Sequence, residues 1–187
     1  MVKQMIAKDD YVIVLDFLQH GKPSDRRAEP VAQCVGDKFF NLLEVAIKDD
    51  VAVKTKDRLY IGESKRDQVK YIRGRINYSE LTSYAKDSIQ EVVVELVQND
   101  EKRFVEFFNK SSSLTTRMHS LELLPGIGKS HLWDILNERK KKPFETFKDV
   151  QDRVSMLPDP KKMIIKRIFN EFEGKDRHRL FVASTML

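Results

Sequence analysis

Residues 121–136 read LELLPGIGKSHLWDIL, and this stretch decides how the C-terminal part of the chain folds. Its apolar residues, spaced for two short helices, are Leu121, Leu124, Ile127, Leu132, Ile135 and Leu136. The joint between the helices is Pro125-Gly126-Ile127-Gly128. Glycine permits a tight turn, and without a Cβ it lets a ligand approach the main-chain N–H groups closely. We therefore predict a helical hairpin, with Ile127 pointing into the core.

The second helix of this hairpin is expected to begin at about Lys129. The first N–H groups of a helix have no intrahelical partner, and the helix dipole places partial positive charge there, so a phosphate group suits this end. The candidate phosphate contacts in the turn are Gly126, Ile127, Gly128, Lys129, Ser130 and His131. Because main-chain groups read phosphate position and not base identity, no sequence specificity is expected. A hairpin used only for folding or for protein contact stays an alternative.

Further cations follow the hairpin. Arg139, Lys140 and Lys141 fall at the far end of the second helix, where they either contact phosphate or neutralise the negative end of the helix dipole. Lys161, Lys162, Lys166 and Arg167 form a basic run on a later helix. A second unit of helix, Pro-containing turn and helix spans residues 144–172, but it lacks the glycines, so a structural role is expected for it. Trp133 is expected in a core or an interface more than on a stacking surface.

Charge is unevenly distributed along the 187 residues. The net charge of the whole chain is +5. Residues 110–187 are strongly basic, with 16 basic against 10 acidic side chains. Residues 54–75 hold eight basic and three acidic side chains, and residues 79–108 hold three basic and seven acidic ones. Two basic segments separated by an acidic one suit a protein that binds a polyanion on one face. The same runs also fit ordinary solvated surfaces.

The first third of the chain alternates in the manner of strands. The expected strands are Tyr11–Leu18, Pro30–Val35, Phe39–Val45, Val51–Lys54, Arg58–Ile61 and Lys70–Ile76. This spacing predicts a small antiparallel barrel, either of the oligonucleotide-binding (OB) type or SH3-like. Basic residues interleaved with Tyr60 and Tyr71 suit single-strand binding, and they are Lys54, Lys56, Arg58, Arg66, Arg73 and Arg75.

Helical periodicity begins near Ser79 and continues to Val97, with Asn99-Asp100 as a stop and a second helix over residues 101–109. The polar break Lys110–Ser113 suggests a domain boundary. We expect an α+β protein with a barrel over residues 1–78, linking helices over 79–109 and a helical-hairpin domain over 110–187. A different interpretation is a non-catalytic scaffold that uses the acidic helix 79–97 to hold a ribosomal or other basic protein.

The stretch 121–136 resembles the helix-hairpin-helix motif of DNA-repair and RNA-processing proteins, and departs from it at Leu132, where the motif has Ala. Over residues 8–182 the chain resembles the archaeal family called domain of unknown function 655. That resemblance implies a β-barrel followed by a helix-hairpin-helix domain. Genes of this family tend to lie near genes for translation and ribosomal-RNA modification, which implies RNA more than DNA as the partner. A DNA-binding repair accessory is a weaker alternative.

No catalytic or metal-binding pattern stands out. Asp149 follows Gly128 at a spacing reminiscent of DNA glycosylases, but without their Gly-Pro context, and a helix-start role is simpler. Cys34 is the one cysteine and reads as a small apolar strand residue. No apolar run approaches the ~18 residues of a membrane span. We expect a cytoplasmic, monomeric protein that is not an enzyme and needs neither cofactor nor metal, with no membrane partner.

Overall fold

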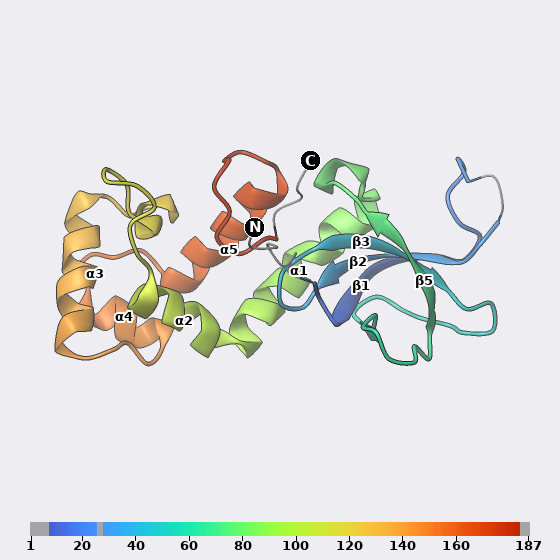
Figure 1. The fold of residues 1–187 in the computed structure, drawn as a ribbon, viewed down its shortest axis with the longest axis horizontal. Coiled ribbons are helices and arrows are strands. Elements are labelled where there is room, and N and C mark those ends of the chain that lie inside the picture. The colour runs from blue at the N-terminus through green and yellow to red at the C-terminus, as the bar shows by residue number, and fades with distance from the viewer. Residues whose placement is uncertain (1–7, 26–27, 184–187) are drawn as a thin grey trace, which may run out of the picture. The chain divides into compact units, whose positions relative to one another are not determined.

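The computed structural model describes residues 8–25 and 28–183, and it confirms the α+β class (Figure 1). The strands come first and are β1 (Tyr11–Leu18), β2 (Val31–Gly36), β3 (Leu42–Ile47), β4 (Arg58–Tyr60) and β5 (Val69–Arg75). The α-helices follow as α1 (Ser83–Asn99), α2 (Glu101–Lys110), α3 (Lys129–Lys141), α4 (Phe147–Arg153) and α5 (Pro160–Phe172). Two short 3₁₀ helices are η1 (Tyr78–Glu80) and η2 (Ser120–Leu123). None of the described helices is long and apolar enough to cross a membrane.

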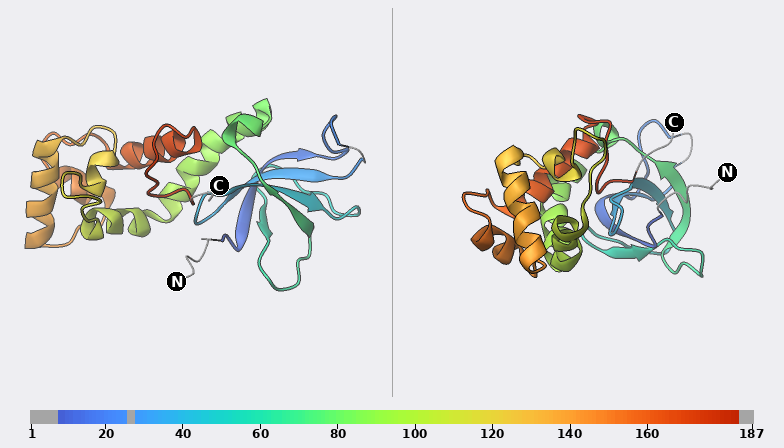
Figure 2. Two further views of the ribbon diagram at one scale, coloured as in Figure 1. Left: turned by 45° about the horizontal axis from the view of Figure 1, so that its top comes forward. Right: turned by 60° about the vertical axis from the view of Figure 1, so that its left-hand side comes forward.

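The five strands form one antiparallel sheet in the order β4-β1-β2-β3-β5, which curls into a half-barrel (Figure 2). Irregularities lie between Val14 and Asp16 in β1 and at two places in the β3–β5 pairing, where β5 supplies the extra residue, and such bulges increase local twist and bending. All four neighbouring pairs are antiparallel, so the two edge strands, β4 and β5, run in the same sense. No ladder joins β4 to β5 among the described strands, so the sheet is a curled half-barrel.

The concave core of the half-barrel follows the strand alternation. Its buried residues include Val12, Val14, Ala32, Cys34, Leu43, Val45, Ile47, Leu59 and Val69. Cys34 is fully buried in β2, which confirms its interpretation as a small apolar strand residue.

The predicted strand Val51–Lys54 is wrong, because this segment is a loop. The Asp57 carboxylate accepts the Lys54 N–H at 2.9 Å, and Lys56 adopts a left-handed backbone with φ of 72°. This local turn takes the backbone out of the ladder, although Val53 still enters the core. The Lys56 N–H rejoins the sheet by donating to Val14 O at 2.8 Å.

Helix α1 begins one turn later than Ser79. Thr82 is the capping residue, since its Oγ1 accepts the Ala85 N–H at 3.0 Å. The same hydroxyl donates to Asp16 Oδ2 at 2.6 Å, and the Thr82 N–H donates to Gln33 Oε1 at 2.8 Å. The start of the helix is thus fastened to β1 and β2, and its end at Asn99 is where the sequence places it.

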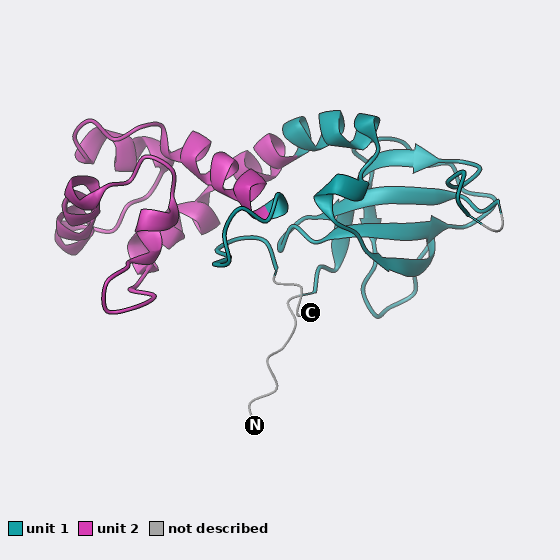
Figure 3. Ribbon diagram, turned by 90° about the horizontal axis from the view of Figure 1, so that it is seen from above, with its two compact units in different colours: residues 1–92, 172–187 teal, residues 93–171 magenta. Residues whose placement is uncertain are grey.

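The chain divides into two compact units, residues 1–92 with 172–187 and residues 93–171 (Figure 3). The division falls within α1, whereas the polar break Lys110–Ser113 lies inside the second unit. The buried core of this second unit includes Phe104, Phe108, Leu121, Leu124, Ile127, Leu132, Ile135, Val150, Ile164 and Ile168. The predicted apolar stripe of residues 121–136 supplies much of that core.

Candidate functional site

The segment before the glycine turn is a single turn of 3₁₀ helix, shorter than the sequence suggests. His119 caps it, because its Nδ1 accepts the Leu121 N–H at 3.1 Å while the Glu122 carboxylate accepts the His119 N–H at 2.8 Å. Leu124 is extended, with ψ of 128°, as expected for a residue that precedes proline. Pro125 therefore ends η2 after four residues.

The two glycines of the turn differ in what they do. Gly126 has φ of 96°, and a Cβ added there would lie 3.2 Å from Pro158 Cγ, so glycine at this position serves the fold. Gly128 has φ of −97° and ψ of −176°, which any residue can adopt, and a Cβ there would meet no atom within 4 Å. Ile127 between them is 7% exposed and points inward, as predicted. Gly128 is thus the glycine that leaves main-chain groups accessible.

Helix α3 begins at Lys129, as predicted, with its first amides uncapped. The Leu132 N–H donates to Gly128 O at 2.9 Å and makes the first intrahelical bond, so the N–H groups of residues 129–131 precede it. Gly128 has no side chain to cap them, and the first turn holds no acidic residue. By contrast, Thr146 caps α4 and Asp159 Oδ1 accepts the Lys162 N–H of α5 at 3.1 Å.

The side chains around this helix start carry charge and polarity. Lys129 Nζ lies 2.6 Å from Glu122 Oε1, and its side chain is 66% exposed. The His119 N–H and the Lys129 ammonium lower the pKa of Glu122. His131 Nδ1 lies 3.1 Å from Gly126 O, and Ser130 is exposed. The structure therefore brings the predicted turn residues together, with one carboxylate beside them that the sequence interpretation did not include.

The predicted cations at the far end of α3 separate into different roles. Arg139 Nη1 donates to Phe108 O at 3.0 Å and to Ser111 O at 2.9 Å, so it closes the end of α2. Burial lowers the pKa of Arg139. Lys141 pairs with Glu138 at 2.6 Å. Lys140 is exposed and has no ion-pair partner among the described residues, so it is the most accessible of the three cations.

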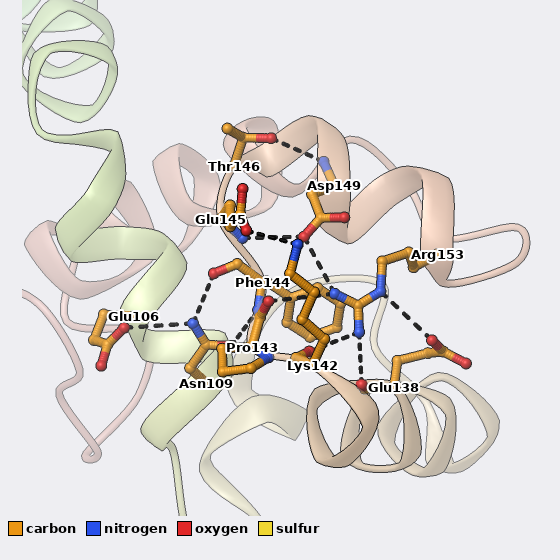
Figure 4. A network of polar contacts seen from close by, with 10 residues as sticks. All are labelled: Glu106, Asn109, Glu138, Lys142, Pro143, Phe144, Glu145, Thr146, Asp149 and Arg153. Carbon is orange, nitrogen blue, oxygen red and sulfur yellow. Dashed lines mark hydrogen bonds and ion pairs between the residues drawn. The ribbon is translucent and has the colours of Figure 1, made fainter.

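A polar network that the sequence analysis missed holds the end of α3 in place (Figure 4). Arg153 Nη2 donates to Glu138 O at 2.6 Å and to Lys142 O at 2.7 Å, and the guanidinium lies 4.5 Å from the centre of the Phe144 ring. Asp149 Oδ2 lies 3.2 Å from Arg153 Nη1 and accepts the Glu145 N–H at 3.0 Å. Asp149 therefore helps to start α4 and fix Arg153, in agreement with the helix-start interpretation.

Several basic residues predicted to contact nucleic acid from the half-barrel form ion pairs within the first unit. Arg73 forms two hydrogen bonds of 2.9 Å with Asp25, and they hold the pKa of this carboxyl well below its usual range. Arg58 Nη2 lies 2.8 Å from Asp37 Oδ2. Lys56 pairs with Glu91 at 3.0 Å. Lys54 is exposed on the loop before β4. These pairs leave the barrel cations less available to a polyanion than their number suggests.

The half-barrel also holds an open cavity of about 780 Å³ between the segments that carry its edge strands. The residues lining it include Leu43, Tyr60, Ile61, Arg66, Ile72, Gly74 and Arg75. Of the predicted aromatic and basic set, Tyr60, Arg66 and Arg75 meet here, while Arg58 and Arg73 do not line the cavity. The acidic residues Asp9, Asp10 and Glu63 line the same cavity, so its charge is mixed.

The core alternative for Trp133 is wrong, and burial removes Arg167 from the predicted basic run on α5. Trp133 is 61% exposed, so it is not a core residue of the second unit. Arg167 is 3% exposed and pairs with Glu171, so it does not belong to an exposed basic run. Lys162 and Lys166 are exposed on α5. Among the described residues, no group of three His, Cys, Asp or Glu side chains is placed to hold a metal ion.

Three comparisons with known proteins find similarity over almost the whole chain. The family model described as "Protein of unknown function (DUF655)" matches residues 8–183. An uncharacterized protein of Methanocaldococcus jannaschii is 43% identical over 176 residues, which are 93% of this chain and 80% of that protein. A crystal structure from Archaeoglobus fulgidus, also of the DUF655 family, is similar with a TM-score of 0.82 and 45% identity. That similarity covers 94% of this chain and 100% of the solved chain.

Proposed function

This chain belongs to the DUF655 family, and we propose that it binds nucleic acid, RNA in preference to DNA, by gripping backbone phosphates at the start of α3. In this proposal the protein holds its ligand without doing chemistry on it. The contact surface consists of the turn Gly126–His131 with the exposed cation Lys140. Arg139 is given a structural role, because its guanidinium is committed to the end of α2.

The observation that carries the proposal is the open start of α3. Main-chain N–H groups of residues 129–131 lie ahead of the first intrahelical bond, and Gly128 adds neither a cap nor a Cβ. Free amides at the positive end of a helix dipole are a binding site for phosphate. Lys129 adds an ammonium group beside these amides, where it pairs with Glu122, and the polar ring of His131 lies in the same turn.

The preference for RNA rests on the family resemblance and not on the geometry of the turn. A phosphate grip of this kind contacts RNA and DNA alike. Genes of the family tend to lie near translation genes, which favours RNA. We propose the half-barrel as a secondary surface, with Lys54, Tyr60 and Arg75 as its contacts, because Lys54 is exposed and Tyr60 and Arg75 line the open cavity.

The arrangement of η2, turn and α3 supports a helix-hairpin-helix unit whose first helix is reduced to one turn. Helices α4 and α5, joined through Pro158, supply a second unit of the same order. Pro158 packs close to Gly126, since a Cβ at Gly126 would lie 3.2 Å from its Cγ. We propose that the second unit supports the first and contacts the ligand less.

Gly128→Asp is the sharpest test. Aspartate is a favoured N-cap residue and Gly128 has the extended backbone of an N-cap, so the variant should be as stable as wild type or a few tenths of a kcal/mol more stable. The same carboxylate occupies the free amides and repels phosphate. We expect RNA affinity to fall at least tenfold in fluorescence-anisotropy titrations, which is about 1.4 kcal/mol.

Gly128→Asn is the matched control, because it caps the helix without adding charge. Its affinity should lie between those of wild type and Gly128→Asp. Wild-type affinity should also fall steeply with salt, as counterion release requires. Unchanged binding by a folded Gly128→Asp variant contradicts the phosphate grip. Wild-type binding no tighter than about 10⁻⁴ M at physiological salt favours the scaffold that holds a basic protein through residues 79–97.

A further inference from the structure

We propose that Trp133 is a stacking platform for an unpaired base, so that the nucleic acid crossing α3 is single-stranded at that point. This inference rests on the proposed function and narrows its ligand from nucleic acid in general to an unpaired strand. The contact is the face of the indole ring, one helical turn beyond the phosphate grip at Gly128–His131.

Trp133 has the exposure and the freedom that stacking needs. Its side chain is 61% exposed, although tryptophan is a residue that folded proteins usually bury deeply. It makes no ring–ring or cation–π contact with another described residue. The neighbours at 132 and 135 are buried, so they fix the helix while the indole faces solvent. An exposed tryptophan with nothing over it marks a surface that meets a partner.

The exposed residues of α3 show which kind of partner fits. They are Lys129, Ser130, Trp133, Asn137, Lys140 and Lys141, and none of them is acidic. Ser130, Trp133, Asn137 and Lys140 recur at intervals of three and four residues, so they share one face of the helix. Lys129 precedes Trp133 by about 6 Å along the helix axis and Lys140 follows it by about 10 Å. An aromatic ring between cations suits a strand that carries bases and phosphates together.

The geometry also separates unpaired from paired ligands. Bases inside a duplex already stack on their neighbours and present only their edges, whereas an unpaired base offers a face to an aromatic side chain. The indole can therefore stack on a base of a single strand, but not on a base inside an intact duplex. Alternative occupants of the exposed indole are a second copy of the chain and another protein.

The chain contains a single tryptophan, so tryptophan emission, excited selectively over the five tyrosines, reports on this position alone. The experiment titrates full-length protein with a short oligouridylate, and separately with the same strand annealed to oligoadenylate. We expect the single strand to quench the emission in parallel with its anisotropy curve, and the duplex to bind with much weaker quenching. Trp133→Leu should weaken single-strand binding about tenfold, or ~1.4 kcal/mol, with the salt dependence unchanged.

Trp133→Phe keeps an aromatic face and should retain most of the affinity. Tyr84→Leu is the matched control, since Tyr84 is 58% exposed on α1, outside this surface, and its loss should leave binding unchanged. Equal single-strand affinity for wild type and Trp133→Leu, in a protein that still loses binding with Gly128→Asp, overturns the stacking inference and leaves the phosphate grip standing. Loss of a concentration-dependent dimer in Trp133→Leu, seen by light scattering, overturns it in favour of a second copy. Absence of binding to every oligonucleotide overturns both proposals.

Discussion

Lys129 Nζ lies 2.6 Å from Glu122 Oε1, so the cation nearest the open start of α3 is paired within the protein. The same carboxylate accepts the His119 N–H at 2.8 Å, and both contacts lower the pKa of Glu122. Glu122 thus caps η2 and places a negative charge beside the proposed phosphate. This negative charge opposes phosphate binding, so its removal should raise the affinity for RNA.

Glu122→Gln is expected to strengthen RNA binding about two- to fivefold, because exposed ion pairs are worth up to ~1 kcal/mol and Lys129 is released. The salt dependence should steepen, by up to about 0.7 in the log–log slope for a single strand. Anisotropy titrations across a salt series measure both. Asp152→Asn is the matched control, since it removes a carboxylate that pairs with Lys148 on α4. If both variants strengthen binding equally, the gain comes from net charge and not from this pair.

A pH dependence of stability is expected from His119. Its side chain is 8% exposed, and burial, with the positive charge of Arg139 as a second cause, lowers its pKa below 6.5. The folded state therefore prefers the neutral ring, which accepts the Leu121 N–H. The stabilisation is complete above about pH 6.5 and is lost as the pH falls, because the unfolded chain binds the proton first.

His119→Asn tests this linkage, because asparagine is a good N-cap whose oxygen can still accept an N–H while it cannot titrate. Below pH 6.5 the wild-type unfolding free energy should fall by up to about 1.4 kcal/mol per pH unit more steeply than that of the variant. Urea unfolding between pH 5 and pH 7.5 measures the difference. Parallel pH profiles for the two proteins rule out His119 as the source.

What the sequence could predict in the second unit was local. Glycine freedom and apolar spacing located the turn, the start of α3 at Lys129 and the inward side chain of Ile127. The sequence predicted a longer helix before the turn than the four-residue η2, although Pro125 explains why this helix ends early. Pattern rules recognise helical spacing over a few residues, but one turn of 3₁₀ helix and a full α-helix satisfy the same spacing.

The roles of individual cations could not be predicted, because they depend on contacts far apart in sequence. Arg139 and Lys140 are neighbours, yet only Arg139 reaches the carbonyl groups at the end of α2, 28 and 31 residues earlier. Arg153 holds the end of α3 by bonding carbonyl groups up to 15 residues earlier. Residue type alone left Trp133 between a core and an interface position for a related reason, because only the packed helix shows which face is left open.

Cys34 provides a probe of the half-barrel. It is fully buried in β2, and burial raises the pKa of its thiol, so the reactive thiolate is scarce in the folded state. We expect native protein to react with a thiol reagent only as fast as it unfolds, and at once in concentrated guanidinium. A Cys34→Ala/Ser155→Cys variant is the control, because Ser155 is exposed and should react immediately when folded. Rapid labelling of the native wild type contradicts the buried position.

The ion pair between Arg167 and Glu171 on α5 is expected to be a main support of the proposed site. The two side chains are 3% and 0% exposed, and Arg167 Nε lies 2.7 Å from Glu171 Oε1. Arg167 Nη1 also donates to Leu123 O at 3.2 Å, and Leu123 is the last residue of η2 before the glycine turn. Removing one partner leaves the other charge buried without the group that faces it, which costs about 3–5 kcal/mol.

Glu171→Gln and Arg167→Met should therefore each lower the unfolding free energy by about 3–5 kcal/mol in urea titrations. The double variant Arg167→Met/Glu171→Leu should recover most of this loss, because an apolar pair of similar volume carries no desolvation penalty. The double variant still lacks the hydrogen bond to Leu123 O, so its RNA affinity should stay below wild type although its stability returns. Single variants that cost less than about 1 kcal/mol contradict a buried, coupled pair. Full affinity in the stable double variant means that η2 keeps its position without Arg167, and the support of the turn then comes from Pro158 packing at Gly126.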